Sequence, residues 1–432
     1  MNTTLRERAR KKGLSYMDFL LREVKKIEKE TGIPRTFLAV CPNSSTVIRA
    51  ALRTAKRNNA PIKFAATLNQ VDLDGGYTGF TPEQFVRSIR KEAQLINFNG
   101  PVIIAIDHGG PWLKDLHRQE QWSLEQSMSA VKRTFEAAID AGYDLIHVDP
   151  TVDITVPPGE TIQIEVVVRR TVELIAHAET FRKSKKLPRI AYEVGTEEVH
   201  GGLADMNAFK TFLEQLKTLL FRNELDDAWP CFVVGKVGTD LHTTVFDPEV
   251  ARKLSSIAAR YGSVIKGHYS DNVSNPHEYP NSGMGGANVG PEFTEQEYAG
   301  LVELCDLEEG LVKKGLVVRP SNLVHILREA VVRSGRWKKW ILPGESADDF
   351  SANSLERQSW LIKTGCRYIW ENPEVVAARM RLYRNLEMNG FDAEEILLSH
   401  IEKSMDKYFH KLNLVDLNDR LMHNKGITLS IL

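Results

Sequence analysis

The sequence predicts an α/β protein, a (β/α)8 TIM barrel followed by a C-terminal helical extension. Eight short runs rich in β-branched residues alternate with longer amphipathic segments. The alternation occupies about 250 residues, which is the length that eight βα units need. After residue 300 the strand pattern stops, and the remaining segments have helical periodicity. Because periodicity alone does not show that a sheet closes, a doubly wound open sheet is the alternative.

Each of the eight predicted strands ends in polar residues or glycine. They cover residues 36–44, 62–70, 102–110, 144–151, 189–197, 231–238, 263–271 and 284–293. The intervening helices, such as 125–142 and 164–184, carry apolar residues at helical spacing. The first of these two ends at Gly142, as helices commonly do. Another helix is predicted to begin at Thr81 and Pro82, a capping residue followed by a first-turn proline.

Three regions follow from these patterns. Residues 1–34 are a basic, amphipathic N-terminal helical segment, residues 35–300 form the barrel, and residues 301–432 form the helical extension. We expect the extension to pack on the barrel or to build an oligomer interface, with its tryptophans in apolar contacts. The loop 270–286 is long and rich in proline, glycine and asparagine, which makes it a candidate lid over the barrel mouth.

The composition excludes several classes of function. The 432 residues carry a net charge near −1, with 42% apolar and 26% charged residues. This balance gives no electrostatic reason to expect a nucleic acid or an anionic membrane as partner. The N-terminus lacks the apolar segment of a signal peptide, and no run of 18 apolar residues occurs. The four cysteines form no CxxC pair, so we expect reduced thiols and a cytoplasmic location.

The ends of the predicted strands hold an unusual number of polar side chains. They are Asn43, Ser44, Asn69, Gln70, Asp107, His108, His147, Asp149, Glu193, Glu197, Asp240, His242, His268, Asp271 and Asn288. In a barrel these ends converge on one opening, where the chemistry of the fold is performed. Taken singly, such a residue is more often a hydrogen-bonded structural histidine or a helix cap. Four histidines together with carboxylates instead suit a divalent metal, Zn²⁺ first and Mn²⁺ or a similar ion second.

Asp107 and His108 are adjacent at the end of the third predicted strand. The chain is turning at this point, so both side chains can approach the mouth, one as a metal ligand and one as a proton donor or acceptor. The glycines that follow allow a sharp turn without filling the site. A capping aspartate beside a buried histidine is the structural alternative.

A glycine-rich loop follows the second predicted strand, within residues 68–85. Gly75, Gly76 and Gly79 expose backbone N–H groups that could hold an anion or a sugar hydroxyl. The loop has no GxGxxG pattern after a first strand, so a dinucleotide site is discounted. A plain glycine turn is the alternative.

Seven sequence elements resemble the family of class II D-tagatose-1,6-bisphosphate aldolase zeta subunits, the accessory subunits called non-catalytic. The elements are "ATLNQVDLDGGYTGFTP" (66–82), "IDHGGP" (106–111), "IHVDPT" (146–151), "VGTEEVHGG" (194–202), "GHYSDN" (267–272), "NVGPEFT" (288–294) and, more loosely, "RWKKW" (336–340). This family is similar in fold to the catalytic class II aldolases, which are zinc-dependent barrels. The resemblance implies Asp107 as the acid/base and His108, His242 and His268 as metal ligands. Glu197 is a further base or ligand, and Glu193 is its rival.

The sequence departs from the catalytic aldolases in the loop that would bind the phosphate of a substrate. The catalytic aldolases follow their strand-seven histidine with a compact glycine-serine loop, whereas Tyr269 and a long loop follow His268 here. The other metal-like residues are retained, which is unexpected for a subunit that only supports a partner.

Two functions are favoured by these patterns, and a sugar-binding module without catalysis is a weaker third alternative. The first is a metal-dependent aldolase-type enzyme that cleaves a ketose or ketose phosphate, or epimerises it at C4. Its expected catalytic residues are Asp107 and Glu197, and its metal ligands His108, His242, His268 and Glu193. Its expected substrate contacts are Asn43, Asn69, Gln70, Gly76, Asp149, Ser270, Asp271 and Asn288. The second function is that of a non-catalytic subunit that stabilises a separate class II aldolase. A homo-oligomer is expected in either case.

Overall fold

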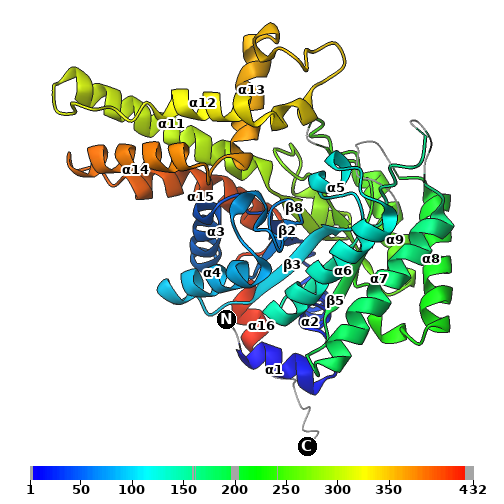
Figure 1. Cartoon of the computed structure of the whole chain (residues 1–432). Coiled ribbons are helices and arrows are strands. Elements are labelled where there is room, and N and C mark those ends of the chain that lie inside the picture. Colours follow the sequence, from blue (N-terminus) through cyan, green and yellow to red (C-terminus); the bar gives the residue numbers. More distant parts are fainter. Residues whose placement is uncertain (1–2, 158–159, 161, 196–203, 241, 424–432) are drawn as a thin grey trace, which may run out of the picture.

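The computed structural model describes residues 3–157, 160, 162–195, 204–240 and 242–423. Its centre is a closed barrel in which the strands follow one another in chain order, from β1 to β8. Every neighbouring pair is parallel, and β8 pairs with β1 to close the ring. The predicted (β/α)8 barrel is confirmed, and the open-sheet alternative is excluded (Figure 1).

Each strand lies inside one of the predicted runs. The strands are β1 (Phe37–Val40), β2 (Ile62–Thr67), β3 (Val102–Gly109), β4 (Leu145–Val148), β5 (Ala191–Gly195), β6 (Phe232–Val234), β7 (Val264–Gly267) and β8 (Met284–Val289). Almost all their residues are buried, because side chains point alternately into the barrel and toward the surrounding helices.

The helices between the strands form the outer layer. They are α3 (Ser45–Arg57), α4 (Pro82–Leu95), α5 (Asp115–Gln119), α6 (Leu124–Ala141), α7 (Ile164–Ser184), α8 (Met206–Arg222), α9 (Pro248–Arg260), α10 (Glu278–Asn281) and α11 (Pro291–Lys313), with short 3-10 turns at Gly76–Thr78 and Asp226–Ala228. Thr81 caps α4 through a capping box with Gln84, and Pro82 stands in its first turn, as predicted. Gly142 ends α6 at a φ of 88°.

Both ends of the described chain lie at the base of the barrel, opposite the mouth (Figure 1). The N-terminal helices are α1 (Thr3–Lys11) and α2 (Tyr16–Thr31), and the C-terminal ones are α15 (Ala393–Lys411) and α16 (Leu417–His423). The guanidinium of Arg6 donates to the carbonyl of Val102 at the start of β3, at 3.0 Å. The backbone N–H of Thr36 donates to the carbonyl of Leu412 at 3.2 Å. Apolar residues between 398 and 421 belong to the barrel's own core.

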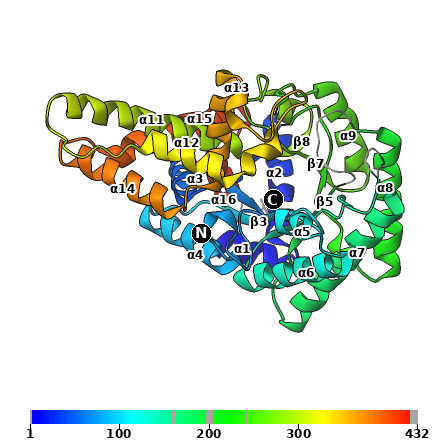
Figure 2. The ribbon, with the colours of Figure 1, turned by 45° about the horizontal axis from the view of Figure 1, so that its top comes forward.

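The rest of the extension is an arm with a separate apolar core. Its elements after α11 are α12 (Leu323–Ser334), α13 (Leu355–Gly365) and α14 (Pro373–Glu387), with 3-10 turns η3 (Arg336–Trp340), η4 (Phe350–Ala352) and η5 (Cys366–Tyr368). Its core runs from Leu301 to Leu397 and includes Trp337 and Trp370. The helices α11, α12 and α14 project to one side of the barrel (Figure 2). The predicted boundary at residue 300 therefore falls inside α11, and residues after 397 rejoin the barrel.

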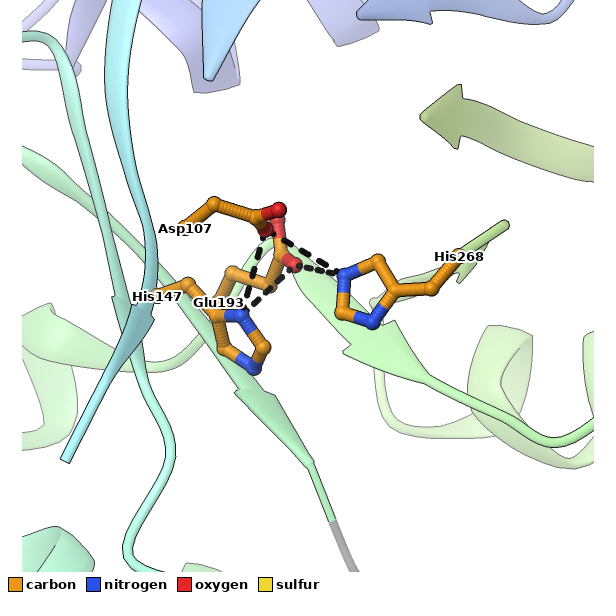
Figure 3. A group of neighbouring side chains, drawn as sticks. All are labelled: Asp107, His147, Glu193 and His268. Carbon is orange, nitrogen blue, oxygen red and sulfur yellow. Dashed lines mark ion pairs between the residues drawn. The ribbon is translucent and has the colours of Figure 1, made fainter. Parts of the chain in front are cut away.

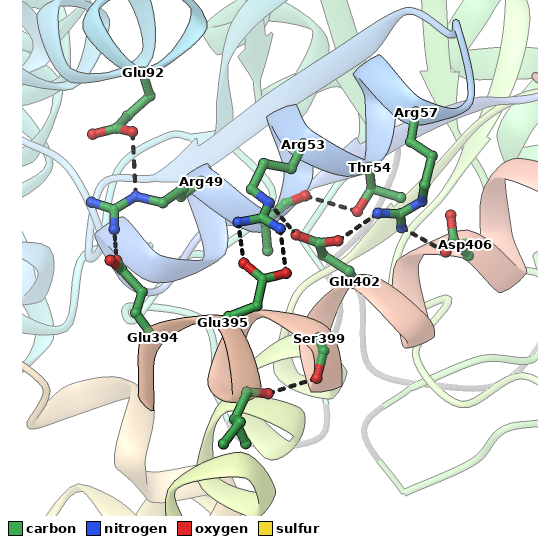
Figure 4. Close-up of polar contacts among 12 residues, drawn as sticks. Arg49, Arg53, Thr54, Arg57, Glu92, Glu394, Glu395, Ser399, Glu402 and Asp406 are labelled. Carbon is green, nitrogen blue, oxygen red and sulfur yellow. Dashed lines mark hydrogen bonds and ion pairs between the residues drawn. The ribbon is translucent and has the colours of Figure 1, made fainter. Parts of the chain in front are cut away.

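A ladder of ion pairs fastens α15 to α3 of the barrel (Figure 4). Arg53 pairs with Glu395 at 2.7 Å and with Glu402 at 2.6 Å. Arg57 pairs with the same Glu402 at 2.5 Å and with Asp406 at 2.6 Å. Glu402 is buried between the two guanidinium groups, so the returning helix is held by charge as well as by apolar contacts.

The mouth is bordered by the extension rather than by the loop 270–286. Only Asp271 of that loop lines the mouth cavity, whereas Arg336 and Trp340 of η3 and Arg367 of η5 do line it. Tyr279, within the loop, is buried and stacks on Phe246 at 4.0 Å between ring centroids. The loop thus packs into the barrel wall.

Three further expectations concern the cysteines, membrane-spanning helices and the tryptophans of the extension. All four cysteines are free. Within the described part of the chain, no helix has both the length and the apolar character needed to cross a bilayer. Trp337 and Trp370 are buried in the core of the arm, as expected of structural tryptophans, whereas Trp340 lines the mouth cavity.

Candidate functional site

A cavity of about 790 Å³ opens at the C-terminal ends of the strands. Ten of the predicted site residues line it: Asn43, Asn69, Gln70, Asp107, His108, Asp149, His242, His268, Asp271 and Asn288. They lie at the ends of seven different strands or in the loops that follow them, which is the convergence that a barrel imposes. The volume is within the range of small-molecule sites.

Four buried side chains meet at the floor of this cavity (Figure 3). Nδ1 of His147 lies 3.5 Å from Oδ1 of Asp107 and 3.4 Å from Oε1 of Glu193. Nε2 of His268 lies 3.3 Å and 3.6 Å from the same two oxygens. The register of β4 and β5 places His147 directly beside Glu193. Two imidazole nitrogens and two carboxylate oxygens therefore point at one centre.

The separations between these atoms match those of a metal coordination shell. Ligand atoms around a tetrahedral ion with bonds of about 2.0–2.1 Å lie about 3.3–3.4 Å apart. The four nitrogen-to-oxygen distances of 3.3 to 3.6 Å agree with this value. Both ring nitrogens of His268 and Nε2 of His147 are buried without a hydrogen-bond partner, whereas the oxygens of Glu193 have only ion pairs with lysines. Because such groups are costly when left unsatisfied, the donor set fits a divalent ion.

Two buried lysines balance the charge of the carboxylates. Nζ of Lys266 lies 3.0 Å from Oδ1 of Asp107 and forms a closer ion pair with Glu193. Nζ of Lys63 lies 3.6 Å from Oε2 of Glu193. Neither lysine lines the cavity, so both act from beneath its floor. Lys266 is thus a cation built into the protein, at the two carboxylates that a metal would also use.

This arrangement keeps both carboxyl groups ionised. Burial opposes the charged form of Asp107, but Lys266 and the histidines His268 and His108 hold its pKa well below its ordinary value. Burial likewise opposes ionisation of Glu193, and Lys266 and His147 outweigh it. Burial, followed by the charge of Lys266, lowers the pKa of His268, which favours the neutral ring that a metal ligand must have.

His108 stands at the edge of this floor, between the other two histidines. Its ring centroid lies 4.3 Å from that of His268 and 5.1 Å from that of His147. Its backbone N–H donates to Nδ1 of His147 at 3.1 Å, the same nitrogen that faces Asp107 and Glu193, so a metal ligated by this nitrogen would displace that bond. A φ of 51° turns the chain here and brings the side chains of Asp107 and His108 to the same cavity. The predicted turn after Asp107 is therefore present.

Amide side chains complete the upper wall. Asn288 donates to Oδ2 of Asp107 at 2.9 Å, and the thiol of Cys41 lies 3.9 Å from the same oxygen. Tyr77 donates to the side-chain oxygen of Asn43 at 2.7 Å, and Gln70 donates to that oxygen at 3.2 Å. These bonds fix the orientation of the polar groups that face the cavity.

The structure does not bring every predicted residue to the cavity. Gly76 lies against the backbone of Gln70, where a Cβ would be only 2.4 Å from the carbonyl oxygen, so it shapes the loop. Ser270 is buried, and its carbonyl accepts a hydrogen bond from Tyr408. His242 lines the outer cavity but is exposed, and its ring faces Trp360 at 5.1 Å. Neither metal-type cluster of the described residues includes His242.

Glu193 and Glu197, the two rival carboxylates, end in different positions. Glu193 points at the centre of the buried cluster with Asp107, His147 and His268, although it does not line the cavity. Glu197 lies outside the described residues.

Several functional residues were not selected from the sequence. His147 was noted at a strand end but was not placed among the metal ligands. Lys266 and Lys63 were overlooked, although a lysine within a strand as apolar as "IKFAAT" or "SVIKGH" is itself a signal of a buried partner. Arg336 and Arg367 were overlooked because no local pattern indicates that the extension reaches the mouth.

The fold and the site together define a (β/α)8-barrel protein with a histidine–carboxylate centre at the C-terminal ends of its strands. The chain belongs to the D-tagatose-1,6-bisphosphate aldolase subunit GatZ/KbaZ-like family, whose model matches residues 21–424. The resemblance inferred from the sequence motifs is thereby confirmed.

Two solved structures share this fold. The chain is similar to a probable tagatose 6 phosphate kinase from Sinorhizobium meliloti, with 22% identity and a TM-score of 0.72, covering 87% of this chain and 100% of that one. It is also similar to the fructose-bisphosphate aldolase of Campylobacter jejuni, with 13% identity and a TM-score of 0.51, covering 92% and 95%. At these identities the likeness supports the barrel fold, and the family match supports an aldolase-subunit-like protein.

Proposed function

We propose that this protein is a metal-dependent enzyme that performs aldol cleavage or C4 epimerisation of a ketose or ketose phosphate. The observation that carries the proposal is the convergence of His147, His268, Asp107 and Glu193 at tetrahedral separations on the floor of a polar cavity. A purely structural ion-pair cluster has no need for two histidines whose outer nitrogens are buried without partners.

Three members of this cluster, His147, His268 and Glu193, would hold the metal, and its fourth member, Asp107, would be left for proton transfer. His108, the ligand that the sequence resemblance adds, has its ring beside those of His147 and His268. The geometry favours His147 over the predicted ligand His242, which is exposed at the rim. Zn²⁺ is the preferred ion, and Mn²⁺ is compatible with the same nitrogen and oxygen donors. When bound, such an ion polarises the carbonyl group of the substrate.

Asp107 would move the proton. It is ionised, faces the cavity and is held by Asn288, so it can accept the proton of the C4 hydroxyl while the C3–C4 bond breaks. If the aldehyde fragment turns over before the bond re-forms, Asp107 returns the proton and the product is the C4 epimer. If the aldehyde leaves, the electron pair of the broken bond takes up a proton at C3 and the outcome is cleavage. Glu197 stays a proposed second proton carrier.

The cavity wall supplies groups suited to a polyhydroxylated substrate. Asn43, Asn69, Gln70 and Asn288 present amides, and Asp149 and Asp271 present carboxylates. Such groups can bind several neighbouring hydroxyls, which supports a sugar rather than an apolar substrate.

An accessory role is the second candidate. It is supported by the description of the family as an aldolase subunit and by the projecting arm, which offers surface to a catalytic aldolase or to a second copy of this chain. In that case the site would be inactive without the partner.

One experiment separates the two roles. The purified protein is analysed for bound metal and then incubated with D-tagatose, D-fructose and their 6-phosphates, with and without EDTA. We expect stoichiometric divalent metal and conversion of one sugar that EDTA abolishes and added metal restores. Asp107→Asn should retain the metal and lose about 10²–10⁴-fold in kcat. Conversion that appears only when a class II aldolase is added would reject the enzyme in favour of the subunit. Conversion by the pure protein that EDTA leaves unchanged would reject the metal requirement.

A further inference from the structure

The side chain of Arg367, in η5 of the extension, is an unusual cation at the cavity. It lines the cavity, yet the residue is only 6% exposed. Its Nε and Nη2 are buried without a hydrogen-bond partner, and it forms no ion pair within the described residues. The groups that act on it are the phenols of Tyr77, Tyr269 and Tyr368, of which Tyr368 also shares a hydrogen bond with it, and the carboxylate of Glu295 lies within its electrostatic reach. A buried guanidinium that has no carboxylate in direct contact is costly, so its position requires an explanation.

The other cations of the cavity wall differ from Arg367 in this respect. Arg336 pairs with Asp115 at 2.5 Å, Lys339 with the same carboxylate at 2.8 Å, and Arg118 with it at 3.2 Å. Each of them therefore has a direct carboxylate partner, although the three share a single one. Arg367 has no such partner, and its Nε and Nη2 keep their hydrogen-bonding capacity.

Aromatic rings hold the guanidinium in a fixed plane. Its central carbon lies 4.6 Å from the ring centroid of Trp340 and 4.9 Å from that of Tyr368. The indole N–H of Trp340 donates to the hydroxyl of Tyr368 at 3.1 Å, which ties the two rings together. A guanidinium stacked by its faces presents its edge, and that edge matches the paired oxygens of a carboxylate or a phosphate.

The same cavity joins this guanidinium to the reacting floor. Tyr269, which follows His268 directly, lies within the electrostatic reach of both Arg367 and Asp107. Its φ of 52° turns its ring away from the strand direction and toward the mouth, where it lines the cavity. A substrate of sugar size can thus contact Arg367 at one end and Asp107 at the other.

We propose that Arg367 is the anion-recognition residue of this site and binds the terminal oxyanion of the substrate, a phosphate ester or a carboxylate. The anionic end lies against the Trp340–Tyr368 pair, and the sugar carbons extend toward Asp107. This assignment rests on the proposed function for its role in a reaction, but the binding of the anion is independent of turnover. It also places phosphate recognition in the extension, whereas the loop after His268 lacks the compact glycine-serine form.

Calorimetric titration of the purified full chain tests the assignment with three matched sugars. D-fructose is neutral, D-fructose 6-phosphate carries a phosphate ester, and D-fructuronate carries a carboxylate at the same carbon. We expect one of the two anionic sugars to bind about tenfold or more tightly than D-fructose, because a charged paired hydrogen bond is gained. The anionic sugar that binds more tightly shows whether the site recognises a phosphate ester or a carboxylate.

Variants assign the effect to the residue. Arg367→Gln should lose most of the preference for the anionic sugar and keep its affinity for D-fructose within about twofold. Arg367→Lys retains the charge but cannot form a paired hydrogen bond. Its affinity for the anionic sugar should therefore lie between those of the wild type and of Arg367→Gln. The matched control is Arg357→Gln, since Arg357 also stacks on a tryptophan, Trp360, at 4.4 Å but is paired with Glu345 outside the cavity. Thermal unfolding of each variant checks that it is folded.

The outcomes are distinguishable from those of the proposed function. Tight, Arg367-dependent binding of an anionic sugar without any turnover supports this assignment and counts against the enzyme. Equal binding of neutral and anionic sugars to the wild-type protein overturns the assignment, whether or not the Arg367 variants fold. Full anion affinity in Arg367→Gln, or in Arg367→Lys if the first variant does not fold, overturns it as well.

Discussion

Oδ2 of Asp149 lies 2.6 Å from Nδ1 of His108. Burial raises the pKa of Asp149, but the bond to His108 and the charge of His147 outweigh it and lower that pKa to about 2, so the shared proton belongs to the imidazole. The ring therefore donates a hydrogen bond from Nδ1, which leaves Nε2 as the nitrogen that can bind a metal. A carboxylate that orients a histidine in this way is the usual outer partner of a metal ligand.

Asp149→Ala should therefore weaken metal binding about 10–100-fold while the protein stays folded. The measurement is a competition titration of the metal-free protein against a chelating dye. Thr151→Val is the graded control, because Thr151 donates to the other oxygen of Asp149 at 2.5 Å and its loss should have a smaller effect in the same direction. Unchanged metal affinity in Asp149→Ala would remove His108 from the ligand set.

The variant Lys266→Met tests whether the buried ammonium group and a metal ion neutralise the same two carboxylates, Asp107 and Glu193. Without Lys266, Asp107 and Glu193 remain buried and poorly compensated, which should lower the free energy of unfolding by about 3–5 kcal/mol in chelator-treated protein. Added Zn²⁺ should recover more stability in the variant than in the wild type, as measured by denaturant unfolding. An equal response to Zn²⁺ in both proteins would place the metal elsewhere.

Glu402→Gln should show how strongly the returning helix is held. Its side chain is 7% exposed and pairs with both Arg53 and Arg57, so the loss of its charge leaves two guanidinium groups less compensated. We expect a loss of about 1–3 kcal/mol in the free energy of unfolding. The matched change Glu395→Gln, at a side chain that is 54% exposed and pairs with Arg53 alone within the described structure, should cost about 1 kcal/mol or less. Equal losses would contradict this account of the ladder.

Asp271→Asn tests a pH dependence of stability. Burial, with the charge of Glu292 adding to it, raises the pKa of Asp271 to about 7, although the backbone N–H groups of Glu292 and Gly290 oppose the shift. The folded protein then binds a proton that the unfolded chain releases near pH 4, so stability falls as the pH rises from about 4 to 7, by no more than about 4 kcal/mol. Asparagine can accept the same two backbone bonds without becoming charged. In chemical unfolding between pH 5 and pH 8, the variant should lack the loss of stability that the ionisation of Asp271 causes. An unchanged loss of stability in the variant would refute the assignment.

The site residues that could be predicted from the sequence are those whose side-chain direction is set by their position within a strand. Every strand lies within a predicted run, because β-branched residues and the polar residues that follow them are local signals. Glu193 sits inside β5 and points into the barrel by the alternation of the strand. His147 sits inside β4 for the same reason, and could have been ranked above His242 on that basis. His242 comes eight residues after the end of β6, where no periodicity sets the direction of a side chain.

The mouth could not be predicted in the same way. Arg336 and Arg367 reach the cavity from more than 200 residues beyond Asp107 in the sequence. Their positions depend on how the arm packs on the barrel, which is a long-range relationship between two surfaces. The proposed lid at 270–286 was suggested by composition, and the burial of Tyr279 could not be read from that composition.

The return of residues 398–421 to the base of the barrel has a consequence for synthesis. Leu398, Ile401, Phe409 and Leu421 belong to the same apolar core as the first strands, which leave the ribosome hundreds of residues earlier. The barrel core therefore stays incomplete through most of translation, and its last contacts close only when α15 and α16 emerge. Contacts of such long sequence separation slow folding, so nascent chains should expose apolar surface to chaperones until late in synthesis.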